Sequence, residues 1–255
     1  MKPLLIDMDG VLRIGNSPAD GLKEFIEFIQ NSKIPACVIS NSTLSNAVQF
    51  KEFFLRNNAE VNFPVMTCAD AAYNYVKENY KTAEVYCSEP VRSMFDEFKT
   101  AGEPEAVVIG DMGKAWDFKI LNEIFVKVYN GADLIAMQKN RFWKTPEDGL
   151  LLDVGPFVKA IEYASGKESV LIGKPSKVFF EMGMKQIDAS FKNGFLMLGD
   201  DLENDIESAQ RLGGEGILIY TGKTKFPLKE NSKVKPNYEA KDLLGVIELL
   251  KQLIC

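Results

Sequence analysis

Acidic residues follow the first short apolar run of the chain, with a spacing that suits metal or acid–base chemistry. Asp7 and Asp9 come directly after residues 4–6, and side chains two residues apart on an extended chain share a face. Two carboxylates that close repel each other unless a cation or a proton joins them. The pair therefore indicates a reactive or metal-binding site, although an ordinary acidic turn after a strand would show the same pattern.

Hydroxyl and amide side chains follow a second apolar run and suit an anion. Ser40, Asn41 and Ser42 come after residues 34–39. Hydroxyls, an amide and backbone N–H groups at the start of a helix can bind the oxygens of a phosphate. The alternative interpretation is an N-terminal cap for a helix that begins near residue 45.

A lysine follows the apolar run 170–172 and would place a compact cation at a strand end. This residue, Lys174, is preceded by Gly173 but does not belong to a Walker A loop. Glu168 occupies the upstream glycine position of that motif, and Pro175 occupies its Ser/Thr position. On its own, Lys174 could equally be a solvated surface charge.

An acidic cluster follows the apolar run 195–198. Asp201 and Asp205 lie four residues apart, and a like-charge pair at that spacing on a helix costs about 0.2–0.5 kcal/mol. Acids at a helix N-terminus complement its dipole, which explains one or two of them. A hard cation such as Mg²⁺, bound by Asp200 and its neighbours, explains the whole cluster better.

The rest of the chain alternates short apolar runs with amphipathic helices. Residues 22, 25, 26 and 29 are apolar at the spacing of one helix face. Strands that alternate with helices of this length predict βαβ units and a mostly parallel sheet, and ligands bind at the carboxyl ends of such strands. The expected strands are 4–6, 34–39, 65–67, 85–87, 106–109, 134–137, 170–172, 195–198 and 217–220, and the expected helices are 22–29, 45–57, 90–101, 117–129, 156–165, 176–187, 203–212 and 240–254.

Composition excludes several classes of protein. The chain has 255 residues, a net charge of −6 and no histidine, so Ser-His-Asp catalysis and His-ligated zinc are excluded. The four cysteines form no C-x-x-C pair and are typical of buried thiols in a reducing compartment. Without a contiguous basic run or a long apolar segment, we expect no nucleic-acid partner, no membrane span and a cytoplasmic location.

Together, and in this order, the four strand-end motifs resemble those of the haloacid dehalogenase superfamily of phosphohydrolases. The matching residues are Asp7-Met8-Asp9-Gly10-Val11, Ser40, Lys174, and Gly199-Asp200 through Asp205. The long interval between the second and third motifs resembles the subclass with a large α/β cap of the C2 type. The resemblance implies an α/β fold, with a doubly wound, Rossmann-like parallel-sheet core (residues 1–71 and 170–255) and an inserted smaller α/β cap domain (residues 72–169).

The resemblance also implies a role for each motif residue. Asp7 would attack phosphorus and form an aspartyl-phosphate, and Asp9 would act as general acid and base. Mg²⁺ would bind Asp7, the backbone carbonyl of Asp9 and Asp200. Asp205 would lie beside the ion or bind it through water, and whether Asp201 contacts the ion is left open.

Substrate contacts follow from the same resemblance. Ser40, Asn41, Ser42 and Lys174 would bind the phosphoryl group. In the cap, residues 138–149 would form a specificity loop. This loop contains Arg141, Phe142, Trp143 and Lys144. Arg141 and Lys144 would contact the leaving group; the alternative is that the loop forms a homodimer surface through the cap.

The expected function is a Mg²⁺-dependent phosphatase of small phosphorylated molecules. Phosphate monoesters are the expected substrates, with phosphoramidates and pyrophosphate as further candidates. Two alternatives stay open: a receiver-like phospho-acceptor that signals, and a phosphate sensor without turnover. The lifetime of an acyl-phosphate on Asp7 would discriminate between turnover and signalling.

Overall fold

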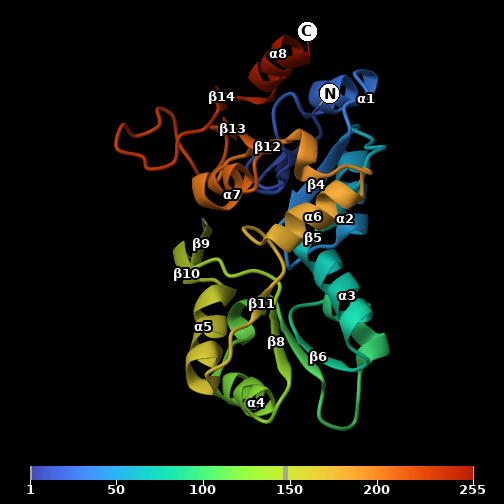
Figure 1. The fold of residues 1–255 in the computed structure, drawn as a ribbon, viewed down its shortest axis with the longest axis vertical. Helices are drawn as coiled ribbons and strands as arrows, with labels where there is room; N and C mark the ends of the chain where they lie inside the picture. Colours follow the sequence, from blue (N-terminus) through green and yellow to red (C-terminus); the bar gives the residue numbers. More distant parts are fainter. Residues whose placement is uncertain (1, 146–148, 255) are drawn as a thin grey trace. The chain divides into compact units, whose positions relative to one another are not determined.

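The computed structural model describes residues 2–145 and 149–254, and these form two compact units (Figure 1). Unit 1 comprises Met1–Ser40, Ala47–Met66 and Lys174–Cys255. Unit 2 comprises Asn41–Asn46 and Thr67–Gly173. The units differ from the predicted domain boundaries at residues 41–46, 67–71 and 170–173, and the assignment of a catalytic core and a cap stays a prediction.

Unit 1 is built on a six-stranded sheet with the order β14-β13-β12-β1-β4-β5. Strand β1 lies in the interior and pairs in parallel with both β4 (Leu4↔Ala36) and β12 (Leu4↔Leu196). The chain first builds the β4 side and later returns to the β12 side, so the sheet is doubly wound, as predicted. Ligands of such sheets bind where the strand order reverses, which here is the carboxyl end of β1. The strands are β1 (Leu4–Ile6), β4 (Ala36–Ser40), β5 (Val65–Thr67), β12 (Leu196–Gly199), β13 (Glu215–Ile219) and β14 (Tyr238–Ala240).

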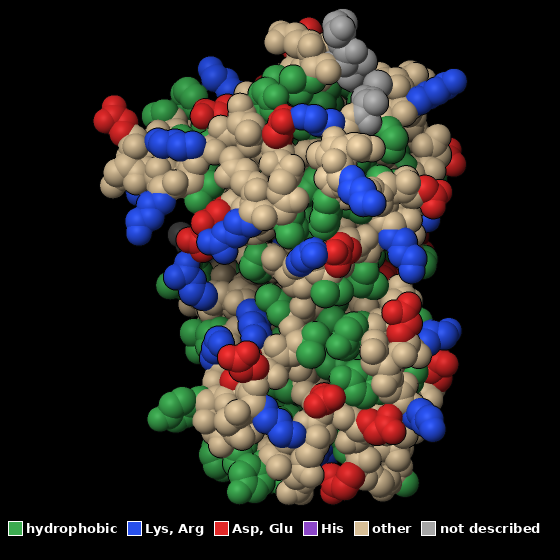
Figure 2. Space-filling view, in the orientation of Figure 1, with side chains coloured by type: hydrophobic (Ala, Val, Ile, Leu, Met, Phe, Trp, Pro, Cys, Tyr) green, Lys and Arg blue, Asp and Glu red, His purple; other side chains and the backbone are tan. Residues whose placement is uncertain are grey.

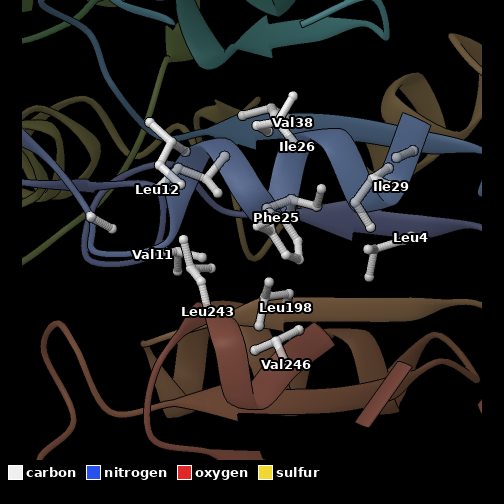
Figure 3. Close-up of a cluster of buried hydrophobic side chains, with 14 of the residues drawn as sticks. Leu4, Val11, Leu12, Phe25, Ile26, Ile29, Val38, Leu198, Leu243 and Val246 are labelled. Carbon is white, nitrogen blue, oxygen red and sulfur yellow. The ribbon is translucent and has the colours of Figure 1, made fainter. Parts of the chain in front are cut away.

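Apolar faces of helices pack on this sheet and form the core of unit 1 with it. Helix α1 (Leu22–Asn31) buries the predicted stripe, including Phe25 and Ile29, against side chains such as Leu198 and Val246 (Figure 3). Each fully buried side chain of this size contributes about 1.5–3 kcal/mol. The other helices of unit 1 are α2 (Ala47–Arg56), α6 (Lys177–Lys185), α7 (Ser208–Arg211) and α8 (Leu243–Ile254).

Unit 2 has its own parallel sheet, with the order β11-β8-β7-β6, and its own apolar core. A separate antiparallel pair consists of β9 (Phe142–Thr145), inside the stretch 138–149 that was expected to be a loop, and β10 (Gly149–Leu152), which begins at the end of that stretch. The sheet strands are β6 (Ala83–Tyr86), β7 (Ala106–Ile109), β8 (Asp133–Ala136) and β11 (Val170–Leu171), and the helices are α3 (Cys68–Asn79), α4 (Phe118–Tyr129) and α5 (Val154–Ser165).

Some elements differ from the sequence prediction. The helix expected at 90–101 is a 3₁₀ segment, η1 (Arg92–Phe98). Its buried Phe95 and Phe98 are three residues apart and so lie on the same face at three residues per turn. The helix expected at 203–212 begins as a π-turn, η4 (Leu202–Glu207), before α7. Helix α3, strand β14 and a short hairpin, β2 (Arg13–Ile14) and β3 (Ser17–Pro18), were not predicted.

Among residues 2–145 and 149–254, no helix has the length and apolar character needed to cross a membrane.

Candidate active site

Three aspartates meet at the carboxyl end of β1. Asp7 follows β1, Asp200 follows the neighbouring strand β12, and Asp205 lies on η4. All three side chains are buried, and one oxygen of each lies within 4.8 Å of the others. Because β1 and β12 are parallel neighbours, their carboxyl ends share one edge of the sheet, which explains how residues so distant in sequence come together.

Lys174 is the cation of this group. Its Nζ donates to Oδ1 of Asp7 at 2.6 Å and to Oδ1 of Asp205 at 2.7 Å, and the lysine is 3% exposed. A buried ion pair of this kind is retained only when its hydrogen bonds are satisfied, since breaking it leaves an uncompensated buried charge. The structure therefore brings together Lys174, Asp7 and Asp205, which the sequence placed at the ends of separate strands.

Burial and neighbouring charges shift the pKa values of these side chains. Burial, followed by the charges of Asp205 and Asp200, raises the pKa of Asp7, although Lys174 opposes the change. Burial and the charge of Asp205 raise the pKa of Asp200 to about 7. Burial also lowers the pKa of Lys174, but Asp205 and Asp7 outweigh it and the pKa lies above its ordinary value. The lysine is therefore a permanent cation, whereas the carboxylates need further positive charge to be ionised together.

A divalent cation fits this group of side chains. Three carboxylates carry three negative charges when ionised, and Lys174 supplies one positive charge. Buried, converging carboxylate oxygens are the hard donors that Mg²⁺ prefers. A bound divalent ion would neutralise the remaining charge, so Asp7 and Asp200 are suited to hold it.

Asp201 is occupied by other contacts. Its Oδ1 accepts the backbone N–H groups of Glu203 (3.0 Å) and Asn204 (3.2 Å), and its Oδ2 accepts Asn204 Nδ2 (2.9 Å) and Lys223 Nζ. Burial alone would raise the pKa of Asp201, but the Lys223 ammonium and the hydrogen bonds from Asn204 lower it. Asp201 lies outside the three-carboxylate group and caps the turn that carries Asp205.

The loop that follows β13 contacts Asp200 through its backbone. The Lys223 N–H donates to Asp200 Oδ2, and the Thr224 N–H donates to the Asp200 carbonyl at 3.1 Å. Gly10 has φ +85°, and a Cβ on Gly10 or Gly222 would collide with Oδ2 of Asp200. Glycine at both positions thus lets two backbone segments approach the carboxylate.

Asp9 makes a different set of contacts from Asp7. It is half-exposed, and its carboxylate pairs with the Arg13 guanidinium at 2.6 Å and accepts Ser40 Oγ at 3.5 Å. Arg13 itself lies 4.9 Å above the centre of the Phe50 ring. Asp9 is therefore held by an arginine that the sequence prediction missed, and its side chain is not one of the three clustered carboxylates.

The remaining predicted residues belong to unit 2. Ser42 Oγ accepts the Leu44 N–H at 3.4 Å, and the Asn41 side chain lies against Gly173. Arg141 is exposed, and Phe142, 52% exposed, is paired with Leu152 across the β9–β10 hairpin. Substrate binding by these residues stays a prediction.

The other two named residues of the predicted specificity loop are Trp143 and Lys144. Trp143 lies on β9 and is half-buried. The side chain of Lys144 and residues 146–148 lie outside what the structure describes.

The sequence prediction missed contacts made by Arg13 and by the loop that follows β13. Arg13 lies four residues after Asp9, a spacing at which an ion pair could have been proposed. Lys223 and Gly222 follow strand β13 in a Thr-Gly-Lys turn. The glycine was the available signal there, because a glycine after a strand often marks a close approach of two backbones.

Family models match two stretches of the chain. A model described as haloacid dehalogenase-like hydrolase matches residues 4–101, and a second, HAD-hydrolase-like model matches residues 171–246. Between them the two stretches contain Asp7, Asp9, Ser40, Lys174 and the acidic cluster.

Known proteins resemble the chain over nearly its whole length. Mouse haloacid dehalogenase-like hydrolase domain-containing protein 2 is 30% identical over 237 residues, which cover 92% of this chain and 90% of the relative. Human phospholysine phosphohistidine inorganic pyrophosphate phosphatase is 29% identical and covers 99% and 95%. The solved p-nitrophenyl phosphatase from Archaeoglobus fulgidus superposes with a TM-score of 0.86 at 21% identity, covering 97% and 98%, and shows the same fold.

Proposed function

The chain belongs to the haloacid dehalogenase-like hydrolases, and from this premise we propose that it is a Mg²⁺-dependent phosphatase of small phosphorylated molecules. The observation that carries the proposal is the buried group of Asp7, Asp200 and Asp205 around Lys174. This group combines a carboxylate nucleophile with the positive charge that an approaching phosphate dianion requires.

Asp7 is the nucleophile in this proposal. One of its carboxylate oxygens forms a bond to phosphorus while the bond from phosphorus to the leaving oxygen breaks. Lys174, 2.6 Å from Asp7 Oδ1, holds the carboxylate in place and offsets its charge. The aspartyl-phosphate that results divides one difficult displacement into two easier ones.

Asp9 moves the protons. It gives a proton to the leaving oxygen in the first step. In the second step it takes a proton from the water that attacks phosphorus, while the bond from phosphorus to the Asp7 oxygen breaks. Arg13 and Ser40 hold its carboxyl group at the edge of the site. In a chain without histidine, a half-exposed carboxyl group is a suitable residue for this exchange.

Mg²⁺ would be held by Asp7, Asp200 and the backbone carbonyl of Asp9. When bound, it stabilises negative charge on the phosphoryl oxygens. Asp205 keeps Lys174 in position through its 2.7 Å ion pair. Asp201 and Lys223 fix the turn and the loop on either side of Asp200.

Substrate choice would be made by residues outside this group. Ser40, Asn41 and Ser42 offer hydroxyl and amide groups to the phosphoryl oxygens, and unit 2 would act as the cap. The relative named for phospholysine, phosphohistidine and inorganic pyrophosphate supports phosphoramidates and pyrophosphate as candidates beside phosphate monoesters.

Phosphate release from a metabolite panel tests the proposal. The panel contains p-nitrophenyl phosphate, sugar phosphates, phospholysine and pyrophosphate, each assayed with Mg²⁺ and with EDTA. We expect catalytic release of phosphate with Mg²⁺ and loss of release with EDTA. A stable acyl-phosphate that persists for minutes without release would instead support the receiver-like alternative and overturn the proposal.

A further inference from the structure

A lysine-rich loop in unit 1 is not used by the proposed reaction beyond its first residues. The segment 221–236, between β13 and β14, contains five lysines and one glutamate in a chain whose net charge is −6. The lysines are separated by other residues, so the sequence shows no contiguous basic run. They are Lys223, Lys225, Lys229, Lys233 and Lys235.

The loop is attached to unit 1 by apolar side chains. Leu228 and Val234 pack against a small cluster that includes Ile206 and Tyr220. The ring of Phe226 lies edge-on to Tyr220, with centroids 5.2 Å apart. These contacts attach the loop to unit 1 at residues 226, 228 and 234 and leave the lysines between them exposed.

The lysines of this loop face outward. Lys225, Lys229, Lys233 and Lys235 are exposed, and Figure 2 shows basic side chains along the loop that Figure 1 draws at the upper left. Within the described part of the chain, the first three form no ion pair with a carboxylate. Lys235 Nζ donates to the Glu230 backbone carbonyl at 3.0 Å. Clustered like charges repel, and binding of an anionic group relieves that repulsion.

We propose that this loop is a docking surface for an acidic segment of a partner protein. Lys233 and Lys235 lie on either side of Val234, which packs inward, and both lysines are exposed. A segment rich in Asp and Glu offers the negative charge that complements these lysines. Phe226, 58% exposed beneath the Lys241 ammonium, supplies the aromatic contact that such interfaces favour.

A protein segment fits this surface better than a membrane or a nucleic acid. Leu228 and Val234 are turned inward, which leaves Phe226 as the large exposed apolar side chain of the loop. One aromatic ring and a few lysines give only weak attachment to a bilayer. Glu230 divides the row of lysines, so the loop offers separate positive charges and not the continuous basic surface that a nucleic-acid backbone requires.

Binding to a labelled acidic peptide tests the inference. The probe is a fluorescein-labelled 12-residue peptide of alternating Glu and Ser, and its anisotropy is measured against the full chain at low salt. The test variant carries Gln at Lys225, Lys229, Lys233 and Lys235. Lys223 is left unchanged because it contacts Asp201. We expect micromolar binding by the unmodified chain and at least about tenfold weaker binding by the variant, since four exposed ion pairs are lost.

A matched variant separates this surface from general charge. It carries Gln at four exposed lysines elsewhere in unit 1, and its binding should change less than twofold. Equal weakening in both variants, or no binding by the unmodified chain, would overturn the inference. So would tighter, loop-dependent binding of phosphatidylserine vesicles or of a single-stranded oligonucleotide. The four control positions are Lys33, Lys51, Lys185 and Lys192.

Phosphatase activity provides an independent readout. Phosphate release from p-nitrophenyl phosphate should stay within twofold of the unmodified chain in both variants, because none of the eight lysines belongs to the proposed site. A tenfold loss of kcat/KM confined to the loop variant would assign these lysines to substrate capture and contradict a docking role. Peptide binding needs no turnover, so failure of the proposed function leaves this test intact.

Discussion

Lys174 is a buried cation held between two carboxylates, and this arrangement limits what each neighbour can do. Its contacts with Asp7 and Asp205 are 2.6 and 2.7 Å. Asp205 can serve Lys174 without approaching the phosphoryl group, whereas Asp7 lies at the end of β1, where ligands of such sheets bind. Asp7 follows β1 and Asp205 lies within η4, so the two carboxylates reach Lys174 from different elements, and we propose different roles for them.

Replacement of the nucleophile gives the first prediction. Asp7→Asn keeps the size of the side chain but removes its nucleophilic oxygen, so phosphate release should fall by about a thousandfold or more. The circular dichroism spectrum should be unchanged. The matched control is Asp20→Asn, an exposed carboxyl in the same unit, which should retain full activity. Activity of Asp7→Asn near the unmodified level would remove Asp7 from the mechanism.

For single residues, the sequence predicted members of the site where a charged side chain follows an expected strand. Asp7, Lys174 and Asp205 could be selected because each follows an apolar run at a short distance. Arg13 follows no expected strand, and Lys223, although it follows the apolar run 217–220, was not selected. Their importance depends on contacts with Asp9 and Asp201 that only the folded backbone creates.

At the scale of elements, the backbone of the loop after β13 packs directly against the Asp200 carboxylate. A Cβ on Gly222 would overlap Oδ2 of Asp200 and crowd Gly10. The loop must therefore carry glycine at this position if the carboxylate is to keep its place. The geometry of the proposed metal site thus depends on a segment outside the four sequence motifs.

Gly222→Ala should consequently impair metal binding more than folding. We expect the Mg²⁺ concentration for half-maximal activity to rise about tenfold, because displacement of one carboxylate ligand costs on the order of 1.4 kcal/mol or more. Calorimetric titration of Mg²⁺ should show the same change without substrate. Gly102→Ala is the control, since its added Cβ would meet only Thr100 Oγ1, at 3.8 Å. Unchanged Mg²⁺ affinity in Gly222→Ala would contradict this role of the loop.

Helix α5 depends on a buried carboxylate. Glu162 pairs with Lys139 at 2.5 Å and Lys159 at 2.6 Å and accepts the Ser169 N–H at 3.0 Å, which ties the helix to the residues before β11. Burial on its own raises the pKa of Glu162, but these ion pairs and hydrogen bonds outweigh it and lower the pKa to about 2.

The lowered pKa predicts a pH-dependent contribution to stability. A depressed pKa stabilises the fold above the unfolded-state pKa, about 4.3, and the contribution is lost as pH falls through about 2. Glu162→Gln should lower the free energy of unfolding by about 2 kcal/mol at pH 7 and by less than half of that at pH 3. Urea unfolding measures both values. Glu181→Gln, in an exposed pair with Lys177, is the control and should change little at either pH; a Glu162 effect that is equal at both pH values would refute the assignment.

Periodicity predicted the elements with a continuous apolar face and failed elsewhere. The stripe on α1 was visible in the sequence and is buried. Helix α3 was missed, although Thr67 and Asp70 form a capping box at its start, a signal that could have found it. In η4 the Asp201 carbonyl accepts both the Asp205 and the Ile206 N–H, a wider turn that apolar spacing does not reveal.

On the scale of the whole molecule, the chain is two α/β units, and the described carboxylate cluster lies entirely in unit 1. The alternation of elements predicted mostly parallel α/β structure, whereas a division into two domains was predicted only from the family resemblance. The sequence could not place residues 41–46 with unit 2, because that depends on contacts such as the Asp111 N–H with Thr43 Oγ1 (3.1 Å). Nor could it show that β11 pairs with β8 in the second sheet.

Mg²⁺ should stabilise the folded chain as a whole. Buried carboxylates repel in the metal-free protein, so a ligand that binds only the folded state adds about 2.7 kcal/mol at 100 times its Kd. For a chain of this size that corresponds to a rise in Tm of roughly 5–10 °C, measured by scanning calorimetry. Asp200→Asn should lose most of this rise, whereas Asp111→Asn, in unit 2, should keep it. No rise in Tm for the unmodified chain would contradict a divalent-ion site.

The covalent state of Asp7 during turnover tests the mechanism most directly. The chain is mixed with ³²P-labelled phospholysine or p-nitrophenyl phosphate and Mg²⁺, quenched in acid within milliseconds, and its peptides are sequenced. The account predicts a label that hydroxylamine releases, on the peptide containing Asp7, and no label in Asp7→Asn. Rapid phosphate release without any labelled peptide, or a label on another residue, would contradict it.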